Sequence, residues 1–222
     1  MGSEESQFHL RNKVDLIKLL HTSKSVNDLY ELTQVYDDNF YFFSKALENA
    51  FKKTKVYKDE GVEKWFLNSL EVSYHLNMAI RMLATLEDLL IKISVNSFII
   101  DNNIAHRFID DVQSARKYYY NNNIKNDINY PDLPNVKNRA TRKLRHHITH
   151  DGDIILKRGL VKEKGMQVVL GDEGYYDRNL EAFNEIYDFL ESDINKVIDN
   201  KLKLEPLVER LIKDELRKVN YK

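Results

Sequence analysis

The sequence contains no cysteine in its 222 residues. Disulfide bonds, thiolate catalysis and cysteine-ligated zinc are therefore excluded, and a cytoplasmic location is the simpler expectation. Only 3 prolines and 7 glycines interrupt the chain. Because these residues are the strongest helix breakers, their scarcity favours long helices over many short strands.

The chain also lacks an excess of charge of either sign and any long apolar run. Lys and Arg total 34 against 35 Asp and Glu, a net charge of −1. This balance excludes a histone-like basic protein, so an anionic partner would need a local cationic patch. The richest apolar window, 83–100, is interrupted by Glu87, Asp88, Lys92 and Asn96 and falls short of the roughly 20 apolar residues of a membrane span. We expect no membrane association.

The strongest periodic pattern predicts a long bundle helix over about 62–96. Apolar residues there alternate steps of four and three, which places them on one helical face. This seam consists of Val72, Leu76, Ala79, Leu83, Leu86, Leu90 and Ile93.

Weaker patterns complete a single all-α domain over residues 1–222 with one small β insertion. Helices are expected in the N-terminal part over 7–55 and, after the polar linker 121–135, over the short segment 136–150. A change of period at 153–171 predicts a β-hairpin. The remaining expected helices cover 104–120, 178–204 and 205–220, the last starting at Pro206.

Residues 135–150 differ from the rest of this charge-balanced chain. They contain five cationic and three histidine side chains but no acidic residue: Lys137, Arg139, Arg142, Lys143, Arg145, His146, His147 and His150. Such a segment suits an anion such as a phosphate backbone. A solvated helix face, balanced by acids elsewhere, is the alternative interpretation.

Three chemistries could use these histidines. His146 and His150, four residues apart, could bind a metal with Asp151 or Asp153, although the neighbouring arginines would repel a cation. The histidines could instead be structural. In phosphoester chemistry, histidine would transfer protons near neutral pH and arginine would bind phosphate oxygens.

The segment from Arg145 to His150 reads Arg-x4-His, and in this respect the sequence resembles the HEPN family (higher eukaryotes and prokaryotes nucleotide-binding). Arg142 and His147 satisfy the same pattern in a second register. The string 74–83, Tyr-His-Leu-Asn-Met-Ala-Ile-Arg-Met-Leu, is similar to the family helix that precedes the motif.

The resemblance implies an antiparallel helical bundle and a metal-independent endoribonuclease with a toxin or phage-defence role and no cofactor. It implies a homodimer, with an antitoxin or a nucleotidyltransferase as further partner. Arg145 would be the phosphate clamp and His150 the general base. Further RNA contacts would come from Arg142, His146, His147, Arg139 and Lys143. Gly152 occupies the position where some members carry a modified Tyr, which disfavours that modification here.

Other polar features favour ordinary structural roles. The run 118–120 of three tyrosines could stack nucleic-acid bases, but helix packing is the favoured interpretation. The acidic pairs at 37–38 and 110–111 are expected to be solvated. The competing function is a non-catalytic HEPN-like module that binds RNA, a nucleotide or a protein through the same basic segment.

Overall fold

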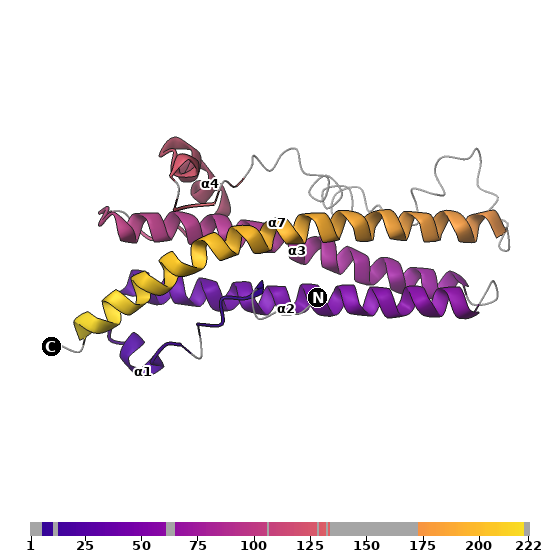
Figure 1. The fold of residues 1–222 in the computed structure, drawn as a ribbon, viewed down its shortest axis with the longest axis horizontal. Helices are drawn as coiled ribbons and strands as arrows, with labels where there is room; N and C mark the ends of the chain where they lie inside the picture. The colour runs from indigo at the N-terminus through magenta and orange to yellow at the C-terminus, as the bar shows by residue number, and fades with distance from the viewer. Residues whose placement is uncertain are drawn as a thin grey trace. The chain divides into compact units, whose positions relative to one another are not determined.

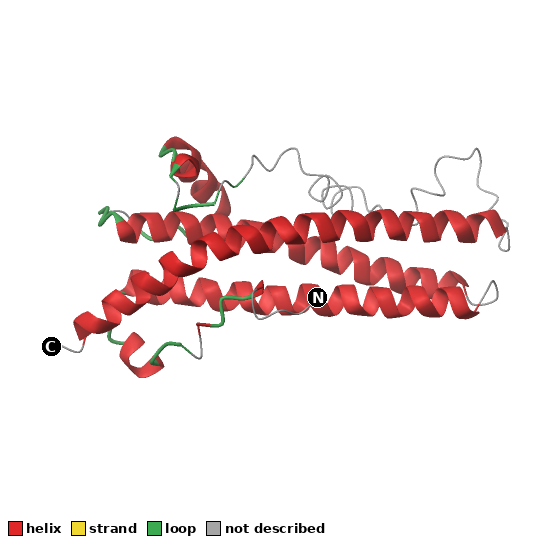
Figure 2. Ribbon diagram, in the orientation of Figure 1, coloured by secondary structure: helices red, strands yellow, loops and turns green. Residues whose placement is uncertain are grey.

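The computed structural model describes residues 6–10, 13–60, 65–105, 107–127, 129–131, 133 and 173–219. All regular structure in these residues is helical, with no strand among them, as predicted for an all-α chain (Figure 2). The elements are α1 (Leu16–Leu19), α2 (Lys24–Glu60), α3 (Trp65–Asp101), α4 (Val112–Asn121), the 3-10 helix η3 (Ile124–Asn126) and α7 (Glu173–Val219) (Figure 1). None of the described helices is long and apolar enough to cross a membrane.

The described residues fall into two compact units. Unit 1 contains those of 6–40, 85–133 and 195–219, and unit 2 contains those of 41–84 and 173–194. Helices α2, α3 and α7 each contribute one part to unit 1 and another to unit 2. The predicted motif helix 136–150 and hairpin 153–171 lie outside the described residues.

The predicted apolar seam of α3 is confirmed. All seven of its side chains, from Val72 to Ile93, are 0% exposed. Burying one such aliphatic side chain contributes about 1.5–3 kcal/mol. Helix α3 is therefore the main apolar scaffold of each unit.

The apolar faces of α2 and α7 supply the remaining core of each unit. In unit 2, the buried residues of α2 are Phe43, Ala46 and Ala50, and those of α7 are Phe183, Ile186, Leu190 and Ile194. The hydroxyl oxygens of Thr54 and Tyr187 lie 3.0 Å apart and join these two helices. In unit 1, buried residues include Val26, Leu29 and Tyr36 on α2 and Val197, Leu204, Val208 and Ile212 on α7.

Helix α7 continues through Pro206, so the predicted break between 178–204 and 205–220 is wrong. A proline inside a helix costs about 3 kcal/mol, because it removes one backbone N–H and crowds the preceding turn. Leu204, Leu207 and Val208 are all at least 93% buried. Their combined burial, at about 1.5–3 kcal/mol each, exceeds the cost of the proline.

The helix predicted over 104–120 begins only at Val112, because Asn96 of α3 binds the preceding backbone. The Asn96 side-chain amide donates to the Ile109 carbonyl and its oxygen accepts the Ile109 N–H, both at 2.8 Å. A helical Ile109 would place these backbone groups in intrahelical bonds instead. Asp111 then caps α4 by accepting the Ser114 N–H at 2.7 Å.

The linker predicted over 121–135 is packed where it is described. Ile124, Tyr130 and Leu133 are buried, and residues 124–126 form η3. The Tyr119 hydroxyl donates to the Pro131 carbonyl and accepts the Leu133 N–H. The polar segment is thus a loop, as its composition predicts, and the hydrogen bonds of Tyr119 anchor it to α4.

Candidate functional site

The motif residues predicted to carry function lie outside the described residues. This applies to Arg145 and His150 and to the expected RNA contacts Arg139, Arg142, Lys143, His146 and His147. The described part of the HEPN-like pattern is the string 74–83 on α3, which belongs to unit 2.

The string 74–83 divides into a core face and an outer face. Leu76, Ala79, Ile80 and Leu83 are 0% exposed, whereas Tyr74 is 62% exposed and Arg81 is also exposed. Residues 74, 77 and 81 follow the i, i+3, i+7 spacing of one helical face. Asn77 is only half-buried as a residue, but its side-chain oxygen is buried and has no hydrogen-bond partner among the described residues.

His75 lies at the edge of this outer face and is half-buried. Burial lowers its pKa below the usual value of 6.5, Glu71 opposes the shift and the Lys53 cation adds to it. Lys53 of α2 and Glu71 of α3 form an ion pair that joins the two helices beside the imidazole. The neutral imidazole is thus favoured at neutral pH.

In unit 1 the first described residues are held by the carboxylate of Asp37. It accepts the Phe8 N–H at 2.7 Å through Oδ1 and the His9 N–H at 2.9 Å through Oδ2. The Gln7 side-chain amide donates to the Asp37 carbonyl at 2.7 Å. We call residues 7–9 together with Asp37 the N-terminal anchor. It explains why the helices predicted over 7–55 do not start at residue 7 and the first of them, α1, covers only Leu16–Leu19: the backbone groups of Phe8 and His9 bind a side chain instead.

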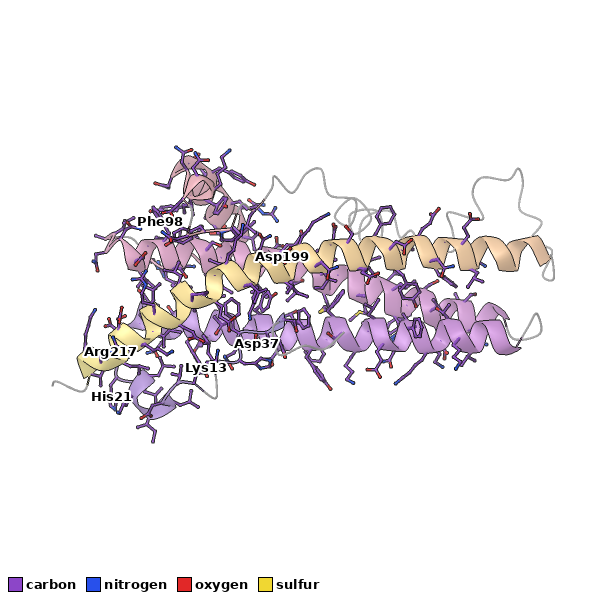
Figure 3. The ribbon with its side chains drawn as sticks, in the orientation of Figure 1. Lys13, His21, Asp37, Phe98, Asp199 and Arg217 are labelled. Atoms are coloured by element: carbon purple, nitrogen blue, oxygen red, sulfur yellow. The ribbon has the colours of Figure 1, made fainter. Side chains whose placement is uncertain are left out.

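The N-terminal anchor lies next to a chain of alternating charges along α7, to which Lys13 also belongs. Figure 3 labels Asp37 and Lys13. Lys201 is 0% exposed, and its ammonium binds Glu205 Oε2 at 2.7 Å and lies 5.4 Å from the centre of the Phe8 ring. Lys13 binds both Glu205 and Glu209, and Lys213 binds Glu209 at 3.0 Å. The buried ammonium of Lys201 is thereby paired, as burial of a charge requires.

Burial raises the pKa of Asp37, and the two backbone N–H groups, together with His9 and Lys201, oppose that shift. Both of its oxygens are already bound to backbone, so the carboxylate serves as a structural acceptor. The prediction of a solvated pair at 37–38 is wrong for Asp37 and right for Asp38, which is exposed. One feature of the sequence hints that Asp37 is partly buried: it directly follows Tyr36, which belongs to the buried apolar face of α2.

The second acidic pair, Asp110 and Asp111, is exposed as predicted, and each carboxylate also has a protein partner. Asp110 binds Lys92 at 3.0 Å, while hydrogen bonds from Ser114 lower the pKa of Asp111. Within the described ranges, no group of three or more His, Asp or Glu side chains could hold a metal ion.

No protein-family model, curated protein or solved structure matches this chain. The resemblance to the HEPN family therefore rests on the motif at 145–150 and on the string at 74–83.

Replacing Asp37 with Asn tests the N-terminal anchor. Asparagine offers one acceptor where the carboxylate offers two, and its NH2 group would face a backbone N–H. We expect a loss of about 1–3 kcal/mol in the free energy of unfolding, measured by urea denaturation. Asp38→Asn is the matched control and should change the stability by less than about 0.5 kcal/mol. Equal stability of Asp37→Asn and the native chain would contradict the structural role of the anchor.

The lowered pKa of His75 predicts a dependence of stability on pH. Because the folded-state pKa lies below the unfolded value of about 6.5, the unfolded state binds the proton first as the pH falls. The stabilisation is complete above pH 6.5 and is lost as the pH falls through the folded-state pKa. Denaturation between about pH 7.5 and 5.5 should therefore show a smaller loss for His75→Gln than for the native chain. His21→Gln, at an exposed position, should lose as much stability over this pH range as the native chain does. If His75→Gln also lost as much as the native chain, the lowered pKa of His75 would not be the cause of the pH dependence.

Proposed function

We propose that the chain is a metal-independent endoribonuclease of the HEPN type. The observation that carries the proposal is the segment 135–150, which combines five Lys and Arg side chains with three histidines and no acidic residue. The helical fold of the described residues agrees with the bundle that the family uses. A toxin or phage-defence role follows from the same resemblance.

RNA supplies its own nucleophile, so the reaction needs only proton transfer and charge stabilisation. His150 accepts the proton of a 2′-hydroxyl, and the 2′-oxygen forms a bond to the adjacent phosphorus. The bond from phosphorus to the 5′-oxygen breaks, and that oxygen receives a proton from an acid in the site. Arg145 binds the phosphate oxygens as their negative charge increases. The products are a 2′,3′-cyclic phosphate and a 5′-hydroxyl.

The spacing of the two motif residues favours a composite site. Five residues along a helix advance about 500°, which offsets Arg145 from His150 by about 140°. On one helix the two side chains would point to different sides. The length of the arginine side chain or a second copy of the chain would bring both groups to one phosphate. Arg142, His146, His147, Arg139 and Lys143 supply further phosphate contacts in this proposal.

The outer face of α3 supports a polar, phosphate-binding role for unit 2. Arg81 is exposed and carries a permanent cation, and Tyr74 exposes 62% of its surface. An exposed arginine and an exposed tyrosine on one helical face agree with a surface that meets a ligand.

The mechanism predicts which substitutions abolish cleavage. His150→Ala should lower the cleavage rate about 10²–10⁴-fold through the lost proton transfer, and Arg145→Ala by a comparable or larger factor. The assay follows labelled single-stranded RNA in EDTA, and a DNA of the same sequence should survive. The 5′ fragment should end in a cyclic phosphate.

His147→Ala is the internal control, because it tests the second register. Loss of cleavage in His147→Ala with full activity in His150→Ala would transfer the roles to Arg142 and His147. If all three variants cleaved RNA at the native rate, the proposed nuclease mechanism would be refuted. The alternative function, a non-catalytic module that binds RNA, a nucleotide or a protein, would then take its place.

We also propose that the active form is a homodimer that joins the two motif segments in one cleft. The support is the number of large apolar side chains that unit 2 exposes. Each of them is between 48% and 67% exposed: Tyr41, Phe42, Phe51, Tyr74 and Phe189. Apolar surface left over after intrachain packing is typical of an interface.

Light scattering at micromolar concentration should give twice the chain mass of 26.3 kDa. A triple substitution of Tyr41, Phe42 and Tyr74 to Ser should shift the protein toward the monomer, because it removes apolar area from the proposed interface. Leu20→Ser, at a residue of unit 1 that is 78% exposed, is the control and should leave the mass unchanged. A strict monomer of the native chain would overturn the homodimer.

A further inference from the structure

In unit 2 an aromatic contact at the surface joins α2 to α7. The ring of Phe51 on α2 meets the ring of Tyr187 on α7 edge to face, with 6.3 Å between the ring centres. The hydroxyl oxygens of Thr54 and Tyr187 lie 3.0 Å apart beside this contact. Phe51 is nevertheless 67% exposed, and Tyr187 is half-buried. The junction of the two helices therefore presents an aromatic ring to solvent.

The two helices expose charges of opposite sign in unit 2. Between 179 and 194, the exposed charges of α7 are all carboxylates: Glu181, Glu185, Asp188 and Glu191. Between 41 and 56, α2 exposes one carboxylate and three lysines: Glu48, Lys45, Lys52 and Lys55. Glu48 binds Lys45 at 2.9 Å and Lys52 at 2.6 Å, so one acid is shared by two of these lysines. The outer side of α2 is thus positive and that of α7 is negative.

Some of these charges flank the aromatic contact directly. Lys55 follows Phe51 by four residues, and Glu191 follows Tyr187 by four, so each charge lies one helical turn from the ring on its own helix. One further lysine and one further carboxylate come directly after the two rings. We call the six residues together the α2–α7 face: Phe51, Lys52, Lys55, Tyr187, Asp188 and Glu191.

The opposite charges of the α2–α7 face are not neutralised within one chain. Among the residues that the structure describes, Lys55, Asp188 and Glu191 form no ion pair. Such a face is complementary to a copy of itself. In a contact with two-fold symmetry, the positive α2 side of each copy meets the negative α7 side of the other, because every contact occurs twice with the roles exchanged.

We infer that a second copy of the chain docks on the α2–α7 face, with Lys52 and Lys55 of each copy opposite Asp188 and Glu191 of the other and the Phe51 rings near the two-fold axis. This inference rests on the proposed homodimer, to which it adds the charge contacts and the α7 side of the interface. Exposed ion pairs add little affinity each. The buried area of the rings therefore supplies most of the affinity, and the charges select the partner and its orientation.

Exchanging the charges of the two sides tests the inference by sedimentation equilibrium. The α2 variant carries Lys52→Glu and Lys55→Glu, and the α7 variant carries Asp188→Lys and Glu191→Lys. Each variant alone sets like charges opposite one another, which should raise the dimer dissociation constant at least about 10-fold. An equimolar mixture of the two variants should form a heterodimer of native affinity, because lysines again meet carboxylates on both sides. A chain with all four substitutions should likewise dimerise as the native chain does.

Two controls separate charge contacts from general effects of charge. Lys117→Glu combined with Lys125→Glu, at exposed lysines of unit 1, changes the net charge as much as the α2 variant does and should leave the dissociation constant unchanged. Raising the salt to about 1 M shortens the Debye length to about 3 Å. It should therefore weaken the native dimer and strengthen the dimer of each charge variant, since attraction and repulsion are both screened.

The outcomes separate this inference from the proposed function. Native dissociation constants in both charge variants would overturn the α2–α7 face and leave the homodimer in place. Weakened dimers that recover neither in the mixture nor in the chain with all four substitutions would overturn the charge pairing. A strict monomer of the native chain would overturn the inference together with the homodimer, while the RNA assay decides the nuclease by itself. Monomeric charge variants that cleave RNA at the native rate would support the face and refute the shared cleft.

Discussion

The fold depends on burying α3, whose apolar residues extend beyond one face. Between positions 86 and 95, Leu86, Leu89, Leu90, Ile91, Ile93 and Val95 are all at most 5% exposed. A helix that is apolar on all sides must be enclosed by other elements. In unit 1 this enclosure includes α4 and the segment 107–133 in addition to α2 and α7. In unit 2 the outer face of α3 leaves Leu70 and Tyr74 exposed, so its enclosure is incomplete.

Enclosure also determines what happens to polar groups on α3. Asn96 is 1% exposed and would be costly without partners, so its hydrogen bonds with Ile109 decide the path of the following backbone. Ser94 is also buried, and its hydroxyl is satisfied within α3 itself, because it donates to the Leu90 carbonyl at 2.7 Å. One buried amide thus explains why α4 starts late.

The sequence predicts the elements that depend on periodicity and misses those that depend on a single distant contact. The α3 seam was predictable because its spacing of threes and fours is independent of tertiary structure. The shortened α1, the late start of α4 and the uninterrupted α7 were not, because each results from a contact or burial energy set by other helices. Asp37 illustrates this limit: its position beside the buried Tyr36 hints at burial, but it does not indicate that the carboxylate binds Phe8 and His9, which lie 29 and 28 residues away. The basic segment 135–150 was evident from composition alone and lies outside the described residues.

The near-zero net charge bears directly on how such a chain would bind RNA. With a net charge of −1, long-range attraction to a polyanion is absent, and phosphate contacts weaken steeply with salt. Five cations in residues 135–150 give a local field, whereas many charges of the described residues are paired with one another, as the series from Lys201 to Lys213 illustrates. Under the proposed function, the electrostatic affinity for RNA therefore depends on the five cations of residues 135–150, which act against a chain that is otherwise balanced in charge.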